Sequence, residues 1–347
     1  MKPSILYVGS LSPECNSFMR YKTLGTLGVS LAGIDTDPFI FKSIFSKIHY
    51  HWNIGPGVRS LNKIVLAMAA KTNPGILLVD NKTYITARTI KKLRKVCLQI
   101  KVVNLLTDDP EGLYGKSWRI FRQTVKMFDL VFVQRKVNIN ELRARGAIRV
   151  ALCLRSFDPQ FHRVVQLTSE ERKKYHTNVG FIGNWEEGRE EYIMYLVSKG
   201  IPVKITGNDW QKGKHWNVLK NHFQSTAVYG DEYVKVINGM DIALHFLRHA
   251  NRDEQDSRTF EIPACGSFML AERSETHLSL FEEGKEAAYF ASKEELLDKV
   301  LYYLENEMER KQVARAGHAR CLSSGYSHSA RLQQVLQEIA QLPQACC

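Results

Sequence analysis

A charged stretch near residue 258 has the residue types and spacing best suited to chemistry. The sequence RDEQDSRTFEIPACGSFMLAE, residues 252–272, places Arg258 three positions before Glu261. Pro263 follows, and because proline is unfavourable inside a long helix but fits a first turn, we expect a short helix here. At the entrance of such a helix, a carboxylate can accept both hydroxyls of a ribose and a guanidinium can hold a diphosphate. A plain intrahelical ion pair, worth about 0.2–0.5 kcal/mol, is the alternative.

Two strand ends in the second half of the chain offer further contacts for a ligand. VGFIGNWEEGREEY ends a strand on Gly183 and Asn184 and begins a helix whose first turns carry Arg189. Helix amides and a guanidinium together suit a phosphate. VKITGNDW ends the next strand on Gly207 and continues to Trp210, against which a nucleobase could pack. A plain turn with a surface arginine and a core tryptophan are the respective alternatives.

Three aspartates are candidates for a catalytic carboxylate. Asp108 and Asp109 follow an expected strand in NLLTDDPEGLYG, where one of them could take a proton from an acceptor hydroxyl. An Asp-Asp-Pro turn that only caps the next segment is the alternative. Asp253 stands eight residues before Glu261, which gives two carboxylates separated by seven residues.

The first strand–helix junction argues against several enzyme classes. YVGSLSPECNSFMR has a single glycine, Gly9, where a dinucleotide-binding fingerprint needs G-x-G-x-x-G. The sequence also has no G-x-x-x-x-G-K-[ST] phosphate loop and no G-x-S-x-G elbow, which disfavours P-loop NTPases and the common hydrolases. Gly9, together with Asn16 as an expected N-cap, still predicts an open loop.

The composition indicates two domains of ordinary size and an anionic partner. The chain has 347 residues, of which 44% are hydrophobic, and a formal net charge of +12. A nucleic acid, an acidic membrane surface or a phosphorylated small molecule would each fit this charge. The run ARTIKKLRKV, residues 87–96, predicts a basic amphipathic helix that contacts anionic lipid, steers an anionic substrate or is only a solvated face. No nucleic-acid-binding motif accompanies the run, so we expect no nucleic acid partner.

Cysteine usage and hydropathy favour a cytoplasmic protein without a structural metal. The seven cysteines are odd in number and show no C-x-x-C or Cys/His ligand spacing, which predicts neither a disulfide framework nor a zinc site. No window approaches the ~18 consecutive apolar residues of a membrane span. The N-terminal SILYVGS is too short and too rich in turn residues for a signal peptide. We therefore expect a cytoplasmic location, with peripheral contact to an anionic membrane as an option.

Short apolar runs alternate with helical patterns along the chain, which is typical of parallel βα units. The expected strands are 5–9, 29–35, 76–80, 101–106, 130–134, 150–154, 178–183, 202–207, 242–247, 267–272 and 287–290. The expected helices are 16–27, 59–71, 85–96, 116–127, 137–145, 188–199, 231–238, 258–265, 293–305, 308–321 and 327–341. A polar stretch at 155–177 separates two such arrays. The sequence therefore predicts two doubly wound α/β domains, 1–158 and 175–325, followed by a C-terminal helical segment, 326–347.

The second half of the chain resembles a known family in its motifs. DSRTFEIPACGSFMLAE followed by FEEGKEAAYFASKEELLDKVLYYL is similar to the spore-maturation CgeB/YkvP-like glycosyltransferases, whose pattern runs R-x-F-E-x-x-A-C-G and then G-K-E. The similarity extends more weakly to VGFIGNWEEGREEY, ITGNDW, YGDEYVKVINGMDIALHF and the N-terminal ILYVG with Arg20. The resemblance implies a GT-B fold, with two facing Rossmann-like domains, a cleft between them and a last helix that crosses back to the first domain.

The resemblance also implies roles for individual residues. The N-terminal domain would take the acceptor, with Gly9, Asn16 and Arg20 on the acceptor-side loop, and the C-terminal domain would take a sugar nucleotide. Retaining GT-B transferases often carry two glutamates separated by seven residues, of which the second binds the ribose. Glu261 falls on the second position, and Asp253 falls on the first, where it replaces the usual glutamate.

Together these features predict a glycosyltransferase that moves a sugar from a nucleoside diphosphate to the hydroxyl of an unidentified saccharide, lipid-linked glycan or protein. We expect neither a metal nor a cofactor, because enzymes of this fold stabilise the departing diphosphate with Arg, Lys and helix amides. The expected donor contacts are Arg258, Glu261, Arg189, Gly183, Asn184, Gly207 and Trp210, and the expected catalytic candidates are Asp253, Asp109 and Asp108. The alternative is a non-catalytic protein of a surface or coat assembly that binds a nucleotide or carbohydrate without transferring it.

Overall fold

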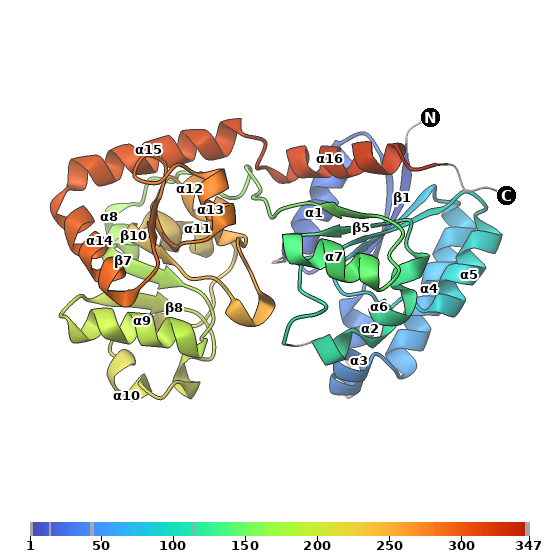
Figure 1. Ribbon diagram of the computed structural model, residues 1–347, viewed down its shortest axis with the longest axis horizontal. Coiled ribbons are helices and arrows are strands. Elements are labelled where there is room, and N and C mark those ends of the chain that lie inside the picture. The colour runs from blue at the N-terminus through green and yellow to red at the C-terminus, as the bar shows by residue number, and fades with distance from the viewer. Residues whose placement is uncertain (1–2, 14, 42–44, 114, 344–347) are drawn as a thin grey trace. The chain divides into compact units, whose positions relative to one another are not determined.

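The chain forms two compact units (Figure 1). The computed structural model describes residues 3–13, 15–41, 45–113 and 115–343. Unit 1 comprises Met1–Arg155, Arg248–Asp253 and His328–Cys347, and unit 2 comprises Ser156–Leu247 and Glu254–Ser327. The short segment 248–253 therefore belongs to unit 1, although segments of unit 2 flank it in the sequence.

Unit 1 is built on a parallel six-stranded sheet with the order β2-β1-β3-β4-β5-β6. Its strands are β1 Ser4–Gly9, β2 Ser30–Asp35, β3 Ile76–Asp80, β4 Lys101–Leu105, β5 Leu130–Val133 and β6 Val150–Leu152. Its helices are α1 Asn16–Thr26, α2 Asp37–Ile40, α3 Ser46–Trp52, α4 Pro56–Thr72, α5 Ala87–Val96, α6 Arg119–Thr124, α7 Lys136–Ala144 and α16 His328–Ala340. Alternate residues of β3 enter two different apolar cores, so the sheet is buried on both faces, as expected for a parallel sheet.

Unit 2 repeats this architecture with the strand order β12-β11-β10-β7-β8-β9, again all parallel. Its strands are β7 Thr177–Ile182, β8 Val203–Thr206, β9 Phe223–Ser225, β10 Met240–His245, β11 Phe268–Glu272 and β12 Ala288–Phe290. Its α-helices are α8 Ser169–Tyr175, α9 Glu187–Ser198, α10 Trp216–Leu219, α11 Gly230–Asn238, α12 Arg258–Ala264, α13 Glu275–Leu280, α14 Lys293–Glu305 and α15 Glu307–Ser323. The prediction of two doubly wound α/β arrays is confirmed.

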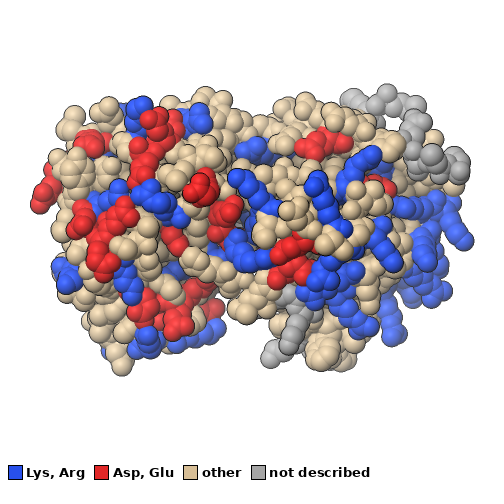
Figure 2. All heavy atoms as spheres, viewed as in Figure 1, with Lys and Arg blue, Asp and Glu red and all other residues tan. Residues whose placement is uncertain are grey.

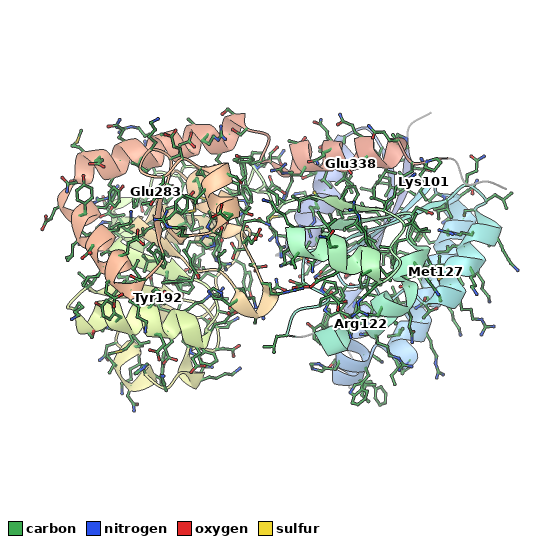
Figure 3. The ribbon with its side chains drawn as sticks, in the orientation of Figure 1. Lys101, Arg122, Met127, Tyr192, Glu283 and Glu338 are labelled. Carbon is green, nitrogen blue, oxygen red and sulfur yellow. The ribbon has the colours of Figure 1, made fainter. Side chains whose placement is uncertain are left out.

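The last helix, α16, packs in unit 1, which confirms the expected return of the chain to the N-terminal array. Its apolar face, which includes Leu332, Val335 and Ile339, joins the core on one side of the unit 1 sheet. Lys101 at the start of β4 fixes the end of the helix, because its ammonium donates to the carbonyl oxygens of Ile339 at 2.9 Å and Leu342 at 3.1 Å (Figure 3). A positive charge at the carboxyl end of a helix also interacts favourably with the helix dipole.

Three local expectations differ from the structure. The stretch 155–177, expected to lack helical order, contains α8, and Thr168 begins that helix with a capping box to Glu171 that is recognisable in the sequence. Asn16 is the first residue of α1, whereas Cys15 occupies the N-cap and makes no side-chain cap. Pro263 lies near the end of α12 and not in its first turn, yet the helix is short as expected.

Candidate functional site

The order of the strands reverses at one point in each sheet, between β1 and β3 in unit 1 and between β7 and β10 in unit 2. Sheets of this kind bind ligands outside the carboxyl ends of the strands at that point, because the loops on the two sides diverge there. The residues that follow these four strands are therefore the first candidates for a site in either unit.

Arg258 lies at the strand reversal of unit 2. It begins α12, and its Nε donates to the carbonyl oxygen of Ile182, the last residue of β7, at 2.6 Å. Its backbone N–H donates to Asp256 Oδ1 at 2.7 Å, and the same oxygen lies 3.0 Å from Nε2 of His245, the last residue of β10. Because 28% of the Arg258 side chain is exposed, a fixed guanidinium is presented at the strand ends with part of its surface open.

Both members of the Arg258–Asp256 pair are held in their charged forms. Burial alone would raise the pKa of Asp256, but His245 and Arg258 outweigh burial and lower that pKa well below its usual range. Burial would likewise lower the pKa of Arg258, but the acidic groups near it, Asp256 and Glu261, raise this pKa above its usual value. Arg258 thus keeps the positive charge that a phosphate group requires.

A chain of buried hydrogen bonds fixes the turn that carries Asp256. The Asp256 backbone N–H donates to Thr259 Oγ1 at 3.1 Å, and this hydroxyl lies 2.9 Å from Nε2 of His277. The other ring nitrogen of His277, Nδ1, lies 2.7 Å from the carbonyl oxygen of Glu272. Since a carbonyl can only accept, Nδ1 carries the proton and Nε2 accepts from Thr259, so neutral His277 supports the turn.

The charge state of His277 makes unit 2 sensitive to acid. Burial, followed by nearby His245, lowers the pKa of His277 to about 3, against ~6.5 in an unfolded chain. The stability that neutral His277 supports is complete above pH ~6.5 and is lost as the pH falls towards 3. We expect the free energy of unfolding to fall by about 2 kcal/mol between pH 7 and pH 5. Denaturant unfolding of the wild type and of His277→Gln at both pH values measures this loss of stability. Equal losses in the two proteins would contradict its assignment to His277.

Glu261 is buried and already has partners inside unit 2. It is 4% exposed, its Oε2 accepts a hydrogen bond from the Tyr233 hydroxyl, and its Oε1 lies 3.6 Å from Nε2 of His162. Burial, and then Glu261, raise the pKa of Tyr233 well above its usual value, so the phenol stays protonated and remains a donor. Tyr233 lies in the weakly similar stretch YGDEYVKVINGMDIALHF, but neither Tyr233 nor His162 was predicted to contact Glu261, because both are distant from it in sequence.

The remaining donor candidates of unit 2 surround the ends of β7 and β8. Arg189 is buried and donates to the carbonyl oxygens of Asn184 at 3.0 Å and Phe246 at 3.4 Å. Its guanidinium therefore links the ends of two strands inside unit 2. Gly207 is required by close packing, since a Cβ there would lie 1.9 Å from the carbonyl oxygen of Gly183. Acidic residues at 186 and 187 begin α9, which disfavours an anion at that helix end.

Trp210 is a core residue and does not present a face to a nucleobase. It is 1% exposed, and its indole Nε1 donates to the carbonyl oxygen of Gly183 at 3.0 Å. Phe181 packs edge-on against the indole at a centroid distance of 5.8 Å. The structure therefore corrects the interpretation of Trp210 as a stacking platform, because an aromatic side chain at a strand end has the same sequence pattern in either role.

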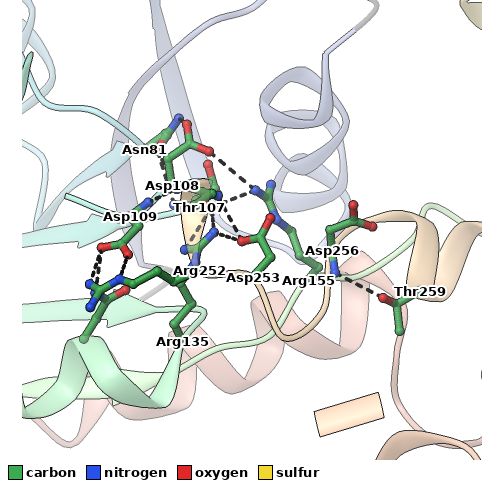
Figure 4. Close-up of polar contacts among 12 residues, drawn as sticks. Asn81, Thr107, Asp108, Asp109, Arg135, Arg155, Arg252, Asp253, Asp256 and Thr259 are labelled. Carbon is green, nitrogen blue, oxygen red and sulfur yellow. Dashed lines mark hydrogen bonds and ion pairs between the residues drawn. The ribbon is translucent and has the colours of Figure 1, made fainter. Parts of the chain in front are cut away.

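In unit 1, Asp109 binds the segment 248–253 through Arg252 (Figure 4). Arg252 Nε lies 2.5 Å from Asp109 Oδ2, and the two remaining guanidinium nitrogens lie 2.7 and 2.8 Å from the carboxylate oxygens of Glu141. Asp109 also accepts from the Asn138 amide at 2.8 Å. Burial would raise the pKa of Asp109, but these donors lower it below its usual value. A buried carboxylate with this many donors is a poor general base.

The two other aspartates differ in accessibility. The Asp253 side chain is only 5% exposed and is bonded to Arg135 and to the Asn251 amide within unit 1, so its carboxylate is committed to an ion pair. The Asp108 side chain is 43% exposed, and its Oδ2 accepts from the Asn81 amide at 2.8 Å. Asp108 is therefore the predicted catalytic carboxylate with an oxygen most open to solvent.

Lys82, which the sequence did not single out, lies beyond the end of β3 near Asp108. Its ammonium lies 4.0 Å from the ring centroid of Tyr50 and donates to the Tyr50 carbonyl oxygen at 2.6 Å. Burial lowers the pKa of Lys82 to about 8, although Asp108 opposes this. A lysine that titrates near neutral pH at the strand reversal can exchange a proton with a ligand.

The residues predicted on the acceptor side stabilise the elements on either side of the loop that follows β1. Arg20 is buried and forms a bidentate pair with Asp80 at 2.7 and 2.8 Å, and Asp80 also accepts from the Tyr7 hydroxyl. At Gly9 a Cβ would lie 2.6 Å from the Ser17 hydroxyl oxygen, so glycine allows α1 to approach β1. Arg20 and Gly9 therefore shape this loop, whereas Asn16 begins α1.

Neither a metal cluster nor a spanning helix is found in the described ranges. Within 3–13, 15–41, 45–113 and 115–343, no three or more His, Cys, Asp or Glu side chains are grouped so that they could hold a metal ion. Over the same part of the chain, no helix combines the length and apolar character needed to cross a membrane.

Comparisons with known proteins agree with this architecture. Residues 189–337 match the family model described as glycosyl transferase-like, while no curated protein matches the sequence significantly. HepE from Anabaena, solved with UDP and glucose, is similar in structure, with a TM-score of 0.64, 12% identity, and coverage of 98% of this chain and 100% of HepE.

Two further solved structures are similar over nearly their whole lengths. Sucrose-phosphate synthase from Thermosynechococcus elongatus has a TM-score of 0.70 and 10% identity, covering 98% of this chain and 99% of that one. A glycosyltransferase from Rickettsia africae has a TM-score of 0.67 and 12% identity, covering 99% and 100%. The chain thus has the two-domain GT-B fold, which confirms the predicted fold class.

Proposed function

We propose that this protein is a glycosyltransferase that moves a sugar from a nucleoside diphosphate to an acceptor hydroxyl. The observation that carries the proposal is Arg258, a charged and partly exposed guanidinium fixed to the end of β7 at the strand reversal. This residue lies within the region 189–337 that matches the glycosyl transferase-like model. The solved complexes of HepE with UDP or UDP-glucose support a nucleotide sugar as the donor.

In this proposal unit 2 binds the donor. Arg258 contacts the diphosphate, whose negative charge grows as the bond to the sugar breaks, so the arginine replaces a metal in stabilising the leaving group. Glu261 binds the ribose hydroxyls after exchanging its hydrogen bond from Tyr233 for those of the ribose. Asp256, His245 and His277 touch no ligand and act by positioning Arg258.

Unit 1 would supply the acceptor side and the base. Asp108 fits the role of base better than Asp109 or Asp253, because its side chain is 43% exposed and lies 3.9 Å from Arg155, whereas the other two carboxylates are buried in close arginine pairs. We assign to Asp108 the removal of the proton from the acceptor hydroxyl. A base of this kind belongs to an inverting mechanism.

The finer assignments rest on sequence motifs and on the chemistry of cysteine. We place the protein among the CgeB/YkvP-like transferases because R-x-F-E and A-C-G stand at 258–266. All five cysteines in the described part of the chain are free thiols, which suits a reducing compartment such as the cytoplasm.

Substitution of Glu261 tests the ribose contact. We expect Glu261→Ala to weaken nucleoside diphosphate binding by about 1–3 kcal/mol, because a charged hydrogen bond to the ribose is lost. Tyr233→Phe is the matched control, since it removes the internal partner of Glu261 but leaves its carboxylate available to ribose. Titration calorimetry should therefore show weaker binding for Glu261→Ala than for Tyr233→Phe.

Two calorimetric and kinetic results would contradict this assignment. Wild-type affinity in Glu261→Ala would show that the ribose does not contact this carboxylate. Nucleotide binding without sugar transfer or donor hydrolysis, across a panel of acceptors, would indicate a binding protein instead of an enzyme.

A further inference from the structure

The net positive charge of the protein comes from one unit. Unit 1 carries 28 Lys and Arg residues against 11 Asp and Glu, whereas unit 2 carries 20 against 25. Figure 2 shows the difference, because blue spheres gather over the part of unit 1 around α4 and α5 while red and blue alternate on unit 2. An excess of this size in one domain indicates a surface that meets an anionic partner.

Helix α5 concentrates this charge on its outward face. Arg88, Lys91, Lys92 and Lys95 recur at helical spacing and are all exposed. Arg94 is paired with Asp129 at 2.9 Å, whereas no ion pair is found for the other four in the described part of the chain. These four residues, hereafter the basic face, line a shallow hollow with Ala87.

Large apolar side chains are exposed beside the basic face. Leu98, two residues beyond α5, is 71% exposed. Ile48 and Trp52 stand four residues apart on α3, and Trp52 is 66% exposed. Helices α3, α2, α4 and α5 pack in succession, and Lys82 ahead of α5 contacts the Tyr50 ring on α3. Leu98 therefore lies directly beside the basic face, whereas Trp52 belongs to the same series of packed helices in unit 1, two helices away from α5.

We propose that the basic face of α5, with the exposed apolar side chains Val96 and Leu98 beside it and Trp52 on α3, docks unit 1 onto an anionic lipid bilayer. Anionic headgroups attract lysine and arginine at the surface. Tryptophan and leucine gain free energy by entering the boundary between headgroups and acyl chains. An enzyme held in this way would meet its acceptor at the membrane.

A bilayer fits this surface better than a nucleic acid does. Nucleic-acid surfaces interleave aromatic side chains with their basic residues so that bases can stack. The exposed face of α5 carries no aromatic residue, and the exposed apolar residues Val96 and Leu98 follow the basic residues directly. Apolar aliphatic groups can insert among lipid acyl chains but offer no aromatic ring on which a base could stack.

Sedimentation with lipid vesicles tests the proposal. The full chain is mixed with vesicles of phosphatidylcholine alone or phosphatidylcholine with phosphatidylglycerol, and the bound fraction is measured at low and high salt. A basic residue at such a surface strengthens binding about fivefold, so changing all four residues of the basic face to Gln should weaken vesicle binding roughly 600-fold. Trp52→Ser should weaken it about tenfold and make little difference to the salt dependence.

A matched control separates this surface from net charge alone. Changing Arg172, Lys173, Lys199 and Lys220 to Gln removes the same charge from exposed positions of unit 2. This control should bind vesicles like the wild type. Nucleotide binding without vesicles should be unchanged in every variant, so the result is independent of the proposed transferase activity.

Three outcomes would overturn the proposal. The first is no preference of the wild type for vesicles that contain phosphatidylglycerol. The second is equal vesicle binding by the basic-face variant and the unit 2 control. The third is tight binding of single-stranded RNA that the basic-face variant loses, with no vesicle binding, which would assign the surface to nucleic acid.

Discussion

Arg258→Ala should lower the turnover number by about 10²–10³-fold, equivalent to ~3–4 kcal/mol of transition-state stabilisation. In the proposed reaction, negative charge builds on the leaving diphosphate, and Arg258 is a charged side chain held at the strand reversal of unit 2. Because the interaction strengthens as the bond breaks, the loss should appear in kcat and not only in KM. The rate of nucleoside diphosphate release at saturating donor concentration measures the turnover number.

Two further variants make this test specific. Arg258→Lys keeps a charge but loses the fork geometry, so its turnover should lie between those of the wild type and the alanine variant. Arg315→Gln removes one exposed charge from the same unit and should leave turnover unchanged. A normal kcat with a raised KM in Arg258→Ala would show that the arginine binds the donor without stabilising the transition state.

Arg252→Ala should destabilise unit 1 by about 3 kcal/mol, because it leaves the Asp109 carboxylate buried without its cation. The Asp109 side chain is fully buried, and Arg252 joins it to Glu141 from a left-handed backbone conformation with φ of 47°. Segment 248–253 therefore depends on these contacts for its place in unit 1. Denaturant unfolding followed by a probe in unit 1 gives the change in free energy.

A surface pair serves as the control for Arg252. Arg145 pairs with Glu111 at 2.6 Å but is 43% exposed, so Arg145→Ala should cost no more than about 1 kcal/mol. Adding Asp109→Asn to Arg252→Ala should restore part of the lost stability, since a neutral amide is less costly to bury. Equal costs for the two arginine variants would show that burial of Asp109 does not control the effect.

Much of the fold was predictable because each parallel strand is buried on both faces. The predicted strand ILLVD, 76–80, coincides with β3. An unbroken apolar stretch of this length, bounded by turn residues, is typical of a strand buried on both faces. The short helix at Arg258 was predictable from local sequence as well, although the place of Pro263 within it was not. Local patterns of this kind depend on neighbours along the chain.

The candidate site was less predictable because its partners are distant in sequence. Arg135 and Asp253 are 118 positions apart, and Asp109 and Arg252 are 143 apart, so no local pattern shows that these aspartates are engaged in ion pairs. Trp210 illustrates a second limit, because burial depends on the whole unit and not on the strand end that precedes it. Arg258 and Asp108 remain the predicted site residues with exposed charge.

A thermal-shift screen tests the central claim most directly, because a ligand that binds only the folded state raises its melting temperature. The wild type and Arg258→Ala are each heated with uridine, guanosine, thymidine and cytidine diphosphates and with their sugars. We predict that at least one nucleotide raises the Tm of the wild type clearly and that of Arg258→Ala much less. If no nucleotide shifts the wild type, or if both proteins shift equally, a donor site at Arg258 is contradicted.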